Sequence, residues 1–513
     1  MTMNSRLPLS VLIRVIRGWI FCFVVGAIVR AGDIQAGFAE RDITPDIGME
    51  RPGGFVKAFH QVLHSPCKVR VAVFSDGSKT AAFVGVDAVQ LPRNVVLEAR
   101  NEIARTTDIL PENIMIVASH SHTSGPTGIL LPGQFDAASK EVQRLAYEES
   151  TMAEASYLKK VTNEIIEGVR LADAALVPAK LAFGFGHEAQ ISFNRRYRMR
   201  NGRIWTNPGN MNPDIVSYAG PIDPQVGVIG AWALDGKLLG TVVNFGTHPS
   251  SLPRGISSNW IHYLERTVQG GLGTTTPVVF LLGPCGDVSS RDSLAKYQRD
   301  PNDWAQMAGG RVGAEVIKVM VSAPRVTKVT LDGRQRVWHI ARRVPSRQTM
   351  ENAWAILKRG KPDAALSQAM TDWVFAKETV LLRHLIEIEP KVEVEVQALQ
   401  VGPAVFVSSP AEYFTEFGLQ IKKASRFPFT FTTELANGAA GYVPMEDDFG
   451  PAGGGYETRL TADTNLEITA GRQFADTGIA LANAMKPDPK PEFPRAEPGG
   501  QPWTYGNVLP GVD

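Results

Sequence analysis

Two histidines separated by a single residue follow an apolar run, and their spacing is suited to metal chemistry. The run Ile114 to Ala118 leads through Ser119 into His120 and His122, in the stretch IMIVASHSHTSGP. In an extended segment, residues i and i+2 point to the same side, so both imidazoles would leave one face at the end of a strand. The pair indicates a metal site, although two rings that only cap a loop by hydrogen bonding would explain it equally well.

Three further apolar runs also end in residues that could act in catalysis. LGTVVNFGT is followed by His248, VVFLLG by a turn that carries Asp287 and Ser289, and AVFVSS by Glu412, where we expect a helix to begin. Each residue alone has an ordinary explanation, as a satisfied polar group, as a cap of the next segment or as the first residue of a helix. Together, the four strand ends supply histidines, a serine and a carboxylate, which is the composition of a catalytic zinc site.

These strand ends carry a resemblance to the neutral ceramidases, the neutral/alkaline non-lysosomal ceramidase family. HSHTSGP resembles the HTHSGP motif of that family with one extra residue after the second histidine, FGTHPSS resembles its second zinc-histidine strand, and GDVSS resembles its serine turn. ERDITPDIG resembles its N-terminal signature. The similarity runs in order from about Gly37 to Tyr456 and does not extend to the C-terminal immunoglobulin-like domain typical of the full-length enzymes.

The resemblance implies roles for individual residues. The zinc ligands that it implies are His120, His248, Glu412 and Tyr442. The substrate-facing residues that it implies are His122, Ser289 as the reacting or positioning serine, Tyr456 as the oxyanion donor, and Arg195. Phenol titrates at a pH of about 10, so a nearby dication would be needed to hold a phenolate ligand ionised. Where the family often has an aspartate after the second histidine strand, this chain has Ser258 and Asn259.

The composition is that of a globular protein with a large core. Of 513 residues, 44% are hydrophobic and 20% are charged. The 53 basic and 52 acidic residues give a net charge of +1 without a basic stripe, which argues against a nucleic-acid-binding protein. No Cys/His cluster is present, so the common structural zinc modules are excluded. Cys67 and Cys285 could form one disulfide or remain two buried thiols.

Residues 1–31 are predicted to be a signal peptide. Three arginines precede or flank the start of the apolar run WIFCFVVGAIV, which is too short for a membrane span and has the length of a signal-peptide core. We expect cleavage after Ala31 and export to the periplasm or the exterior. The alternative is an uncleaved signal that anchors the protein in a membrane, which would place two of the arginines inside the span.

Apolar runs that alternate with helical patterns predict an α/β fold of mixed β-sheets flanked by helices. We expect one domain over 32–485, because no Gly/Ser linker divides it, and a Pro-rich extended tail over 486–513. The other expected strands are 68–74, 80–89, 181–186, 226–234, 239–247, 278–283, 392–402, 404–409 and 429–433. The expected helices are 92–106, 141–171, 303–321, 349–359 and 412–423.

These expectations combine into an exported hydrolase with one zinc ion (Zn2+) per chain, acting on the carboxamide bond of ceramide-like N-acyl lipids. Zinc would polarise the carbonyl or lower the pKa of bound water to about 7. The expected partners are the N-acyl lipid or another small amide and, transiently, a membrane surface, and the oligomeric state stays open. Two alternatives remain: a metal-independent serine esterase, for which GxSxG is absent around Ser289, and a non-catalytic exported binding protein.

Overall fold

The computed structural model describes residues 33–251, 255–497, 499–506 and 509–512. The predicted signal peptide, 1–31, lies outside these residues. The fold is α/β, with mixed sheets flanked by helices, as the sequence predicts.

A sheet of nine strands provides two of the predicted strand ends that carry histidines. Its strands are β1 (Gln35–Asp42), β2 (Lys68–Ser75), β3 (Thr80–Val86), β4 (Ile114–Ala118), β5 (Val177–His187), β10 (Gln225–Ala233), β11 (Leu238–Phe245), β12 (Val278–Leu282) and β14 (Arg325–Val326). Their hydrogen-bonded order is β12-β11-β10-β5-β1-β2-β3-β4, with β14 paired to β5. The pairs β3/β4 and β11/β12 are parallel, as expected for strands joined by crossover helices.

The two ends of this sheet pack against each other. β3 approaches β12 at Gly85, where a Cβ atom would collide with the carbonyl oxygen of Phe280. Glycine therefore permits a backbone contact that any side chain would prevent. The closure brings the ends of β4 and β11, which lie in different halves of the sheet, into one region of the molecule.

A second sheet of four strands and several short strands complete the β-structure. The four strands are β15 (Leu331–Ala341), β16 (Lys391–Val401), β17 (Ala404–Ser408) and β19 (Phe429–Thr433), in the order β15-β16-β17-β19. The short strands are β6 (Phe193–Asn194), β7 (Arg196–Met199), β8 (Ile204–Thr206), β9 (Ile215–Tyr218), β13 (Val288–Ser289), β18 (Glu412–Tyr413) and β20 (Tyr442–Val443). β18 pairs in parallel with β20, and β13 pairs with β6.

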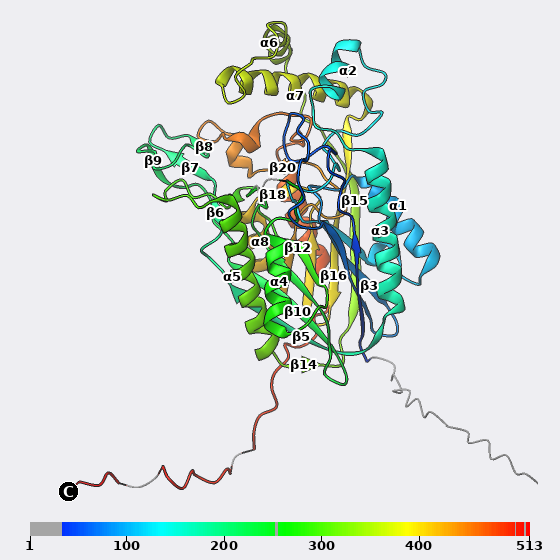
Figure 1. Ribbon diagram of the computed structural model, residues 1–513, viewed down its shortest axis with the longest axis vertical. Helices are drawn as coiled ribbons and strands as arrows, with labels where there is room; N and C mark the ends of the chain where they lie inside the picture. Colours follow the sequence, from blue (N-terminus) through cyan, green and yellow to red (C-terminus); the bar gives the residue numbers. More distant parts are fainter. Residues whose placement is uncertain (1–32, 252–254, 498, 507–508, 513) are drawn as a thin grey trace, which may run out of the picture.

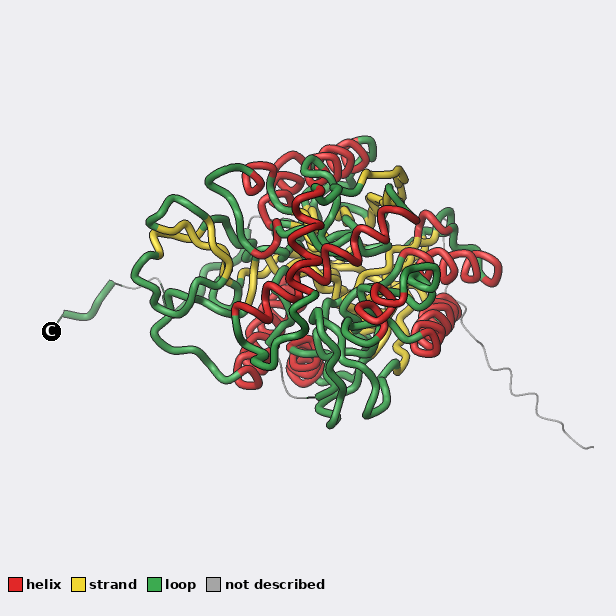
Figure 2. Tube along the Cα trace, turned by 90° about the horizontal axis from the view of Figure 1, so that it is seen from above, coloured by secondary structure: helices red, strands yellow, loops and turns green. Residues whose placement is uncertain are grey.

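Helices cover the sheets on both sides and at one end. They are α1 (Arg93–Thr106), α2 (Lys140–Tyr147), α3 (Ala155–Ala174), α4 (Trp260–Leu272), α5 (Pro301–Ser322), α6 (Arg347–Leu357), α7 (Gln368–Ile388), α8 (Thr415–Ala424) and α9 (Ala470–Asn483). Figure 1 shows α4 and α5 along one side of the strands and α1 and α3 along the other. α2, α6 and α7 share a separate apolar cluster at the top of that view, and Figure 2 shows helices crossing over the strands from above.

The expected helix over 141–171 is wrong in one respect, because the structure divides it into α2 and α3. The segment between them makes bonds that a helix could not accommodate. The backbone amide of Met152 donates to the carboxylate of Glu50 at 2.7 Å, and Met152 also forms a bridge with Leu130. These distant partners hold the segment extended.

Other parts of the chain bear on the remaining expectations. Cys67 and Cys285 are two separate buried thiols, which is one of the two readings left open. Over 486–497 the chain forms neither helix nor strand, and Asp488 accepts hydrogen bonds from the amide and hydroxyl of Thr330 at 2.7 and 2.9 Å. Within the described part of the chain, no helix combines the length and apolar character that crossing a membrane requires.

Candidate active site

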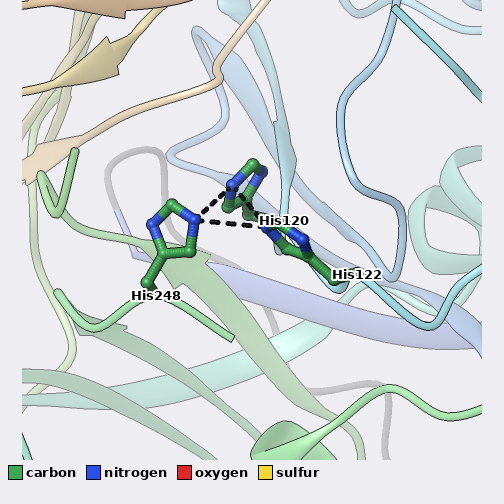
Figure 3. Close-up of side chains that lie close together, drawn as sticks. All are labelled: His120, His122 and His248. Carbon is green, nitrogen blue, oxygen red and sulfur yellow. Dashed lines mark hydrogen bonds between the residues drawn. The ribbon is translucent and has the colours of Figure 1, made fainter. Parts of the chain in front are cut away.

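His120, His122 and His248 bring their Nε2 atoms close to one point, as Figure 3 shows. The Nε2 atoms lie 3.0 Å apart between His120 and His248, 3.1 Å between His122 and His120, and 3.2 Å between His122 and His248. Nitrogen ligands at 2.0 to 2.1 Å from a tetrahedral zinc ion would stand about 3.3 Å apart. The three Nε2 atoms are therefore close enough together for two or all three of them to bind a single ion.

The backbone at His120 is not extended, which makes the expectation of a continuous strand through the histidine pair wrong. Its φ of 61° lies in the left-handed region, which costs a non-glycine residue roughly 1–3 kcal/mol and occurs most often at functional sites. After this turn, the amide of His122 donates to the carbonyl of Pro249 at 3.4 Å. The turn thus directs the pair toward the end of β11, where His248 lies.

The hydrogen-bond partner of Nδ1 indicates the tautomer of each imidazole ring. Each Nδ1 atom faces a backbone carbonyl oxygen, which can only accept, so Nδ1 carries the proton and Nε2 keeps its lone pair. Three lone pairs about 3 Å apart with no proton between them repel one another unless a cation lies among them. Bonds of this kind also orient imidazoles that bind metals. The carbonyl partners are Val89 for His120 at 2.7 Å, Gly53 for His122 at 3.0 Å and Cys285 for His248 at 3.5 Å.

Glu412 adds a carboxylate to this group. Its Oε2 atom lies 3.2 Å from Nε2 of His120 and 3.9 Å from Nε2 of His248. The same oxygen is buried and has no hydrogen-bond partner among the described residues. Burial and the neighbouring His120 hold the pKa of His248 well below its usual value, so that ring is neutral at pH 7. Although burial opposes it, the carboxylate of Glu412 raises the pKa of His120. A buried carboxylate oxygen without a hydrogen-bond partner, close to imidazole nitrogens, fits a bound cation.

The expected helix at Glu412 begins three residues later, at Thr415, and this correction explains how Glu412 reaches the site. Glu412 lies in β18, and its amide donates to the carbonyl of Gly441 at 2.9 Å. The carboxylate of Asp287 accepts hydrogen bonds from the amide and hydroxyl of Thr415, both at 2.9 Å, and so caps α8. Glu412 is thereby free of a capping role.

Tyr442 is the residue directly opposite Glu412, because β18 and β20 pair in that register. The guanidinium carbon of Arg195 lies 5.2 Å from the centre of the Tyr442 ring. Burial raises the pKa of Tyr442 well above its usual value, although Arg195 opposes the change. The phenol is therefore neutral at pH 7 unless a cation displaces its proton.

Arg195 lies between two tyrosines. Its guanidinium carbon is also 5.8 Å from the centre of the Tyr456 ring, and the rings of Tyr442 and Tyr456 are 5.3 Å apart. Its Nε donates to Glu457 Oε1 at 2.8 Å, and its Nη2 donates to the carbonyl of Gly286 at 2.7 Å. These two bonds fix the orientation of the guanidinium. The structure thus brings Arg195, Tyr442 and Tyr456 together with Glu412.

Ser289 lies on β13, opposite Phe193 and two residues along the partner strand from Arg195. Ser289 and Arg195 line the same cavity, which has a volume of about 690 Å³. Within the described residues, the Oγ atom of Ser289 contacts only the backbone of Arg291, whose amide donates to it at 3.3 Å. No histidine contacts this hydroxyl in the described part of the chain, so the structure supplies no base for a metal-independent serine esterase.

Ser258 and Asn259, which follow the second histidine strand, are both fully buried. Oδ1 of Asn259 accepts hydrogen bonds from the amide of Trp260 at 2.9 Å and from the hydroxyl of Ser251 at 2.8 Å, and so caps α4. The hydroxyl of Ser258 is buried and makes no hydrogen bond among the described residues.

Glu434 is a functional candidate that the sequence analysis missed. It is fully buried, and its carboxylate accepts hydrogen bonds from the amides of Tyr413 at 2.7 Å and Cys285 at 3.0 Å. Burial raises its pKa to about 8. The signal that could have found it is the same as for His248, a charged or polar residue directly after a buried apolar strand, here FTFTT.

Comparison with known proteins gives one curated relative and two solved structures of similar fold. No protein-family model matches the chain. A neutral ceramidase of Pseudomonas aeruginosa is 28% identical over 140 residues, which are 27% of this chain and 18% of that protein. The matched stretch is therefore a small part of that relative.

Two solved structures are similar to this chain over most of its length. The crystal structure of neutral ceramidase from Pseudomonas aeruginosa superposes with a TM-score of 0.65 and 18% identity, covering 90% of this chain and 76% of that one. A ceramidase solved in complex with C2 gives a TM-score of 0.62 and 17% identity, covering 90% of this chain and 77% of that one. The predicted resemblance is confirmed: the chain has the fold of the neutral ceramidases.

Proposed function

We propose that the protein is a zinc-dependent amidohydrolase that cleaves the N-acyl bond of ceramide-like lipids to a fatty acid and an amine. The observation that carries the proposal is the convergence of three imidazole Nε2 atoms beside the unpartnered Oε2 of Glu412. The likeness to neutral ceramidase supports an amide as the bond that is cleaved and an N-acyl lipid as the substrate class.

His120, His248, Glu412 and Tyr442 would hold the zinc ion, while His122 would face the substrate. His120 and His248 are buried, whereas His122 is only half-buried. Glu412 contacts both buried rings, and no contact within 4.0 Å joins it to His122 among the described residues. Nitrogen and oxygen donors of this kind suit zinc. When bound, zinc supplies a Lewis acid that polarises a carbonyl and makes water acidic enough to act near neutral pH.

The remaining residues would act on the amide itself. Tyr456 would donate a hydrogen bond to the carbonyl oxygen as negative charge develops there, a contribution on the order of 3 kcal/mol for one donor. Arg195 stays positively charged, because Tyr442 and Glu457 outweigh the effect of burial and raise its pKa well above the usual value. Its fixed orientation would place that charge beside both tyrosines and stabilise the same developing anion.

Ser289 has two possible roles that an experiment separates. As a nucleophile, its Oγ would form an ester with the acyl group, the amine would leave with a proton, and water would then cleave the ester. As a positioning residue, it would orient the attacking water by a hydrogen bond. An acyl-enzyme that accumulates in the wild-type protein requires the first role, and near-normal turnover in Ser289→Ala excludes it.

The proposal is tested by metal content and by turnover. We expect about one zinc per chain in the purified protein, loss of hydrolysis of fluorogenic N-acyl amides in chelator, and recovery when zinc is restored. Activity that persists in chelator without stoichiometric zinc would contradict the proposal. Ester hydrolysis that ignores zinc would favour the serine esterase, and absence of turnover on every amide and ester would favour a binding protein.

Export is a separate proposal that rests on residues 1–31. It is supported by the short apolar run after the basic N-terminus. Mass spectrometry of the protein recovered from a secreting host should give an N-terminus at Gly32. A membrane-bound product that retains 1–31 would instead support the anchored alternative.

A further inference from the structure

The cavity lined by Ser289 and Arg195 carries more positive than negative side chains, which is unusual for a site that, under the proposed function, would receive a neutral lipid amide. Three arginines and one aspartate are among the side chains that line it: Arg195, Arg291, Arg299 and Asp292. Arg195 forms an ion pair with Glu457 at 2.8 Å, so these two charges offset each other in the charge of the cavity. The carboxylate of Asp292 is engaged by the hydroxyl of Tyr218 at 2.9 Å and by the amide of Leu294 at 2.9 Å.

Arg291 and Arg299 are the two charges that remain uncompensated. Both side chains are exposed, and among the described residues neither has a carboxylate within 4.0 Å. Because Asp292 contributes one negative charge, the lining carries an excess of one positive charge, which is borne by two guanidinium groups without an ion-pair partner. Guanidinium groups bind carboxylate and phosphate through paired hydrogen bonds, so this excess favours an anionic oxygen group.

Neutral polar groups in the same cavity also lack protein partners. The side chains of Gln190, Asn207, Ser250 and Ser290 make no hydrogen bond within the described part of the chain. Each can donate a hydrogen bond to an oxygen atom of a ligand. Phe193, Trp304 and Met307 supply an apolar part of the lining. The cavity thus combines donors for an anion with room for a short apolar segment.

We propose that this cavity selects amide substrates that carry a carboxylate or a phosphate near the scissile bond, with Arg291 and Arg299 as the specificity-determining residues. The inference rests on the proposed amidohydrolase function and ranks anionic amides, including the phosphate ester of a ceramide-like lipid, above a neutral ceramide. The chemistry of the preferred substrate is that of an N-acyl amino acid or of the phosphate ester of an N-acyl amino alcohol. A bare N-acyl amino alcohol leaves both guanidinium groups unpaired and is the poorer substrate.

Three substrates with one acyl group test the proposal on the zinc-loaded full chain. N-octanoylglycine carries a carboxylate, N-octanoylethanolamine phosphate carries a phosphate, and N-octanoylethanolamine is neutral. We expect kcat/KM to be about 10-fold higher for at least one anionic substrate than for the neutral one, which is the effect of one charge-assisted hydrogen bond. The anionic substrate with the higher kcat/KM shows whether the cavity selects a carboxylate or a phosphate.

The variant Arg291→Gln/Arg299→Gln should abolish this preference, lowering the ratio of kcat/KM between anionic and neutral substrates about 10-fold, mainly through KM. A folding defect would lower kcat/KM for the anionic and the neutral substrates alike and would leave their ratio unchanged. Arg266→Gln on α4, which replaces another exposed arginine away from the cavity, should leave the ratio at the wild-type value.

Two other results would overturn the inference in distinguishable ways. Equal kcat/KM for all three substrates, unchanged in the double variant, would show that the cavity does not select anions while leaving the amidohydrolase function intact. Absence of hydrolysis of all three amides and of the fluorogenic amides, with zinc bound, would overturn the proposed function and this inference with it.

Discussion

The carboxylate of Glu434 accepts a hydrogen bond at 2.7 Å from the backbone amide of Tyr413, the residue that follows Glu412. The same carboxylate accepts one from the amide of Cys285, whose carbonyl accepts from Nδ1 of His248. Glu434 therefore connects the segment that carries Glu412 with the residue whose carbonyl orients His248. It lies behind the site and acts on it through backbone positions.

Glu434→Ala should weaken zinc binding by about 10- to 100-fold, the range found when groups that orient metal ligands are removed. The side chain of Glu434→Gln can still accept from both amides, so this variant should retain most of the affinity. Competition between the metal-free protein and a chromogenic chelator measures the affinity, and circular dichroism confirms that each variant is folded. Glu351→Ala on α6, an exposed carboxylate remote from the site, is the matched control. A folded Glu434→Ala protein with wild-type zinc affinity would contradict the positioning role.

Alanine variants of the three histidines should separate ligands from the substrate-facing ring. We expect His120→Ala and His248→Ala to lose stoichiometric zinc, because each removes a buried ligand. His122→Ala should keep zinc while kcat falls by about 100-fold or more, the range for loss of a group that moves a proton in catalysis. Metal analysis and turnover on the same preparations give both quantities. Loss of zinc from His122→Ala equal to that from His120→Ala would make His122 a ligand instead.

Zinc binding should release a proton from Tyr442. Burial holds the pKa of this phenol well above its usual value, so the metal-free protein carries the proton at pH 7 and a phenolate ligand forms only as zinc binds. The wild-type protein should therefore release about one proton more than Tyr442→Phe. Calorimetric titration in buffers of different ionisation enthalpy counts these protons. Equal release from both proteins would show that Tyr442 remains protonated beside the metal.

From the sequence, the strands that end in site residues are easier to predict than the way in which these strand ends come together in space. His120, His248 and Glu412 each follow an apolar run, and the structure confirms the runs as β4, β11 and β17. The pairing of Glu412 with Tyr442 involves strands of only two residues, too short for a periodic pattern, and depends on Glu434 and the closure of the sheets. His122 is less buried than His120, a difference that spacing in a sequence does not encode.

The helix α7 was not predicted from the sequence, and its buried charges explain why. α7 buries Lys377 and Glu378, which pair at 2.7 Å, and the Nζ atom of Lys377 also donates to the carbonyl of Phe55 at 2.8 Å. Adjacent buried charges break the apolar periodicity by which an amphipathic helix is identified. Phe55 is 322 positions away from Lys377 in the sequence, so only the folded structure accounts for this contact.

Stability in acid should depend on a buried ion pair remote from the site. Glu265 on α4 lies 2.8 Å from Arg70 on β2. Although burial acts in the opposite direction, Arg70 and Lys68 lower the pKa of Glu265 from 4.5 to about 2. Because the folded pKa is below the unfolded one, the stabilisation is complete above pH 4.5 and is lost as the pH falls toward 2.

Glu265→Gln should therefore reduce the free energy of unfolding at pH 7 by on the order of 3 kcal/mol, and the difference from wild type should narrow as the pH falls toward 2. Denaturant titrations of the metal-free protein between pH 7 and pH 3 measure this difference. Glu351→Gln, which removes an exposed carboxylate from α6, should stay close to wild type throughout, since exposed pairs contribute little. A difference for Glu265→Gln that stays constant down to pH 3 would mean that lost packing, rather than the charge of Glu265, accounts for the destabilisation.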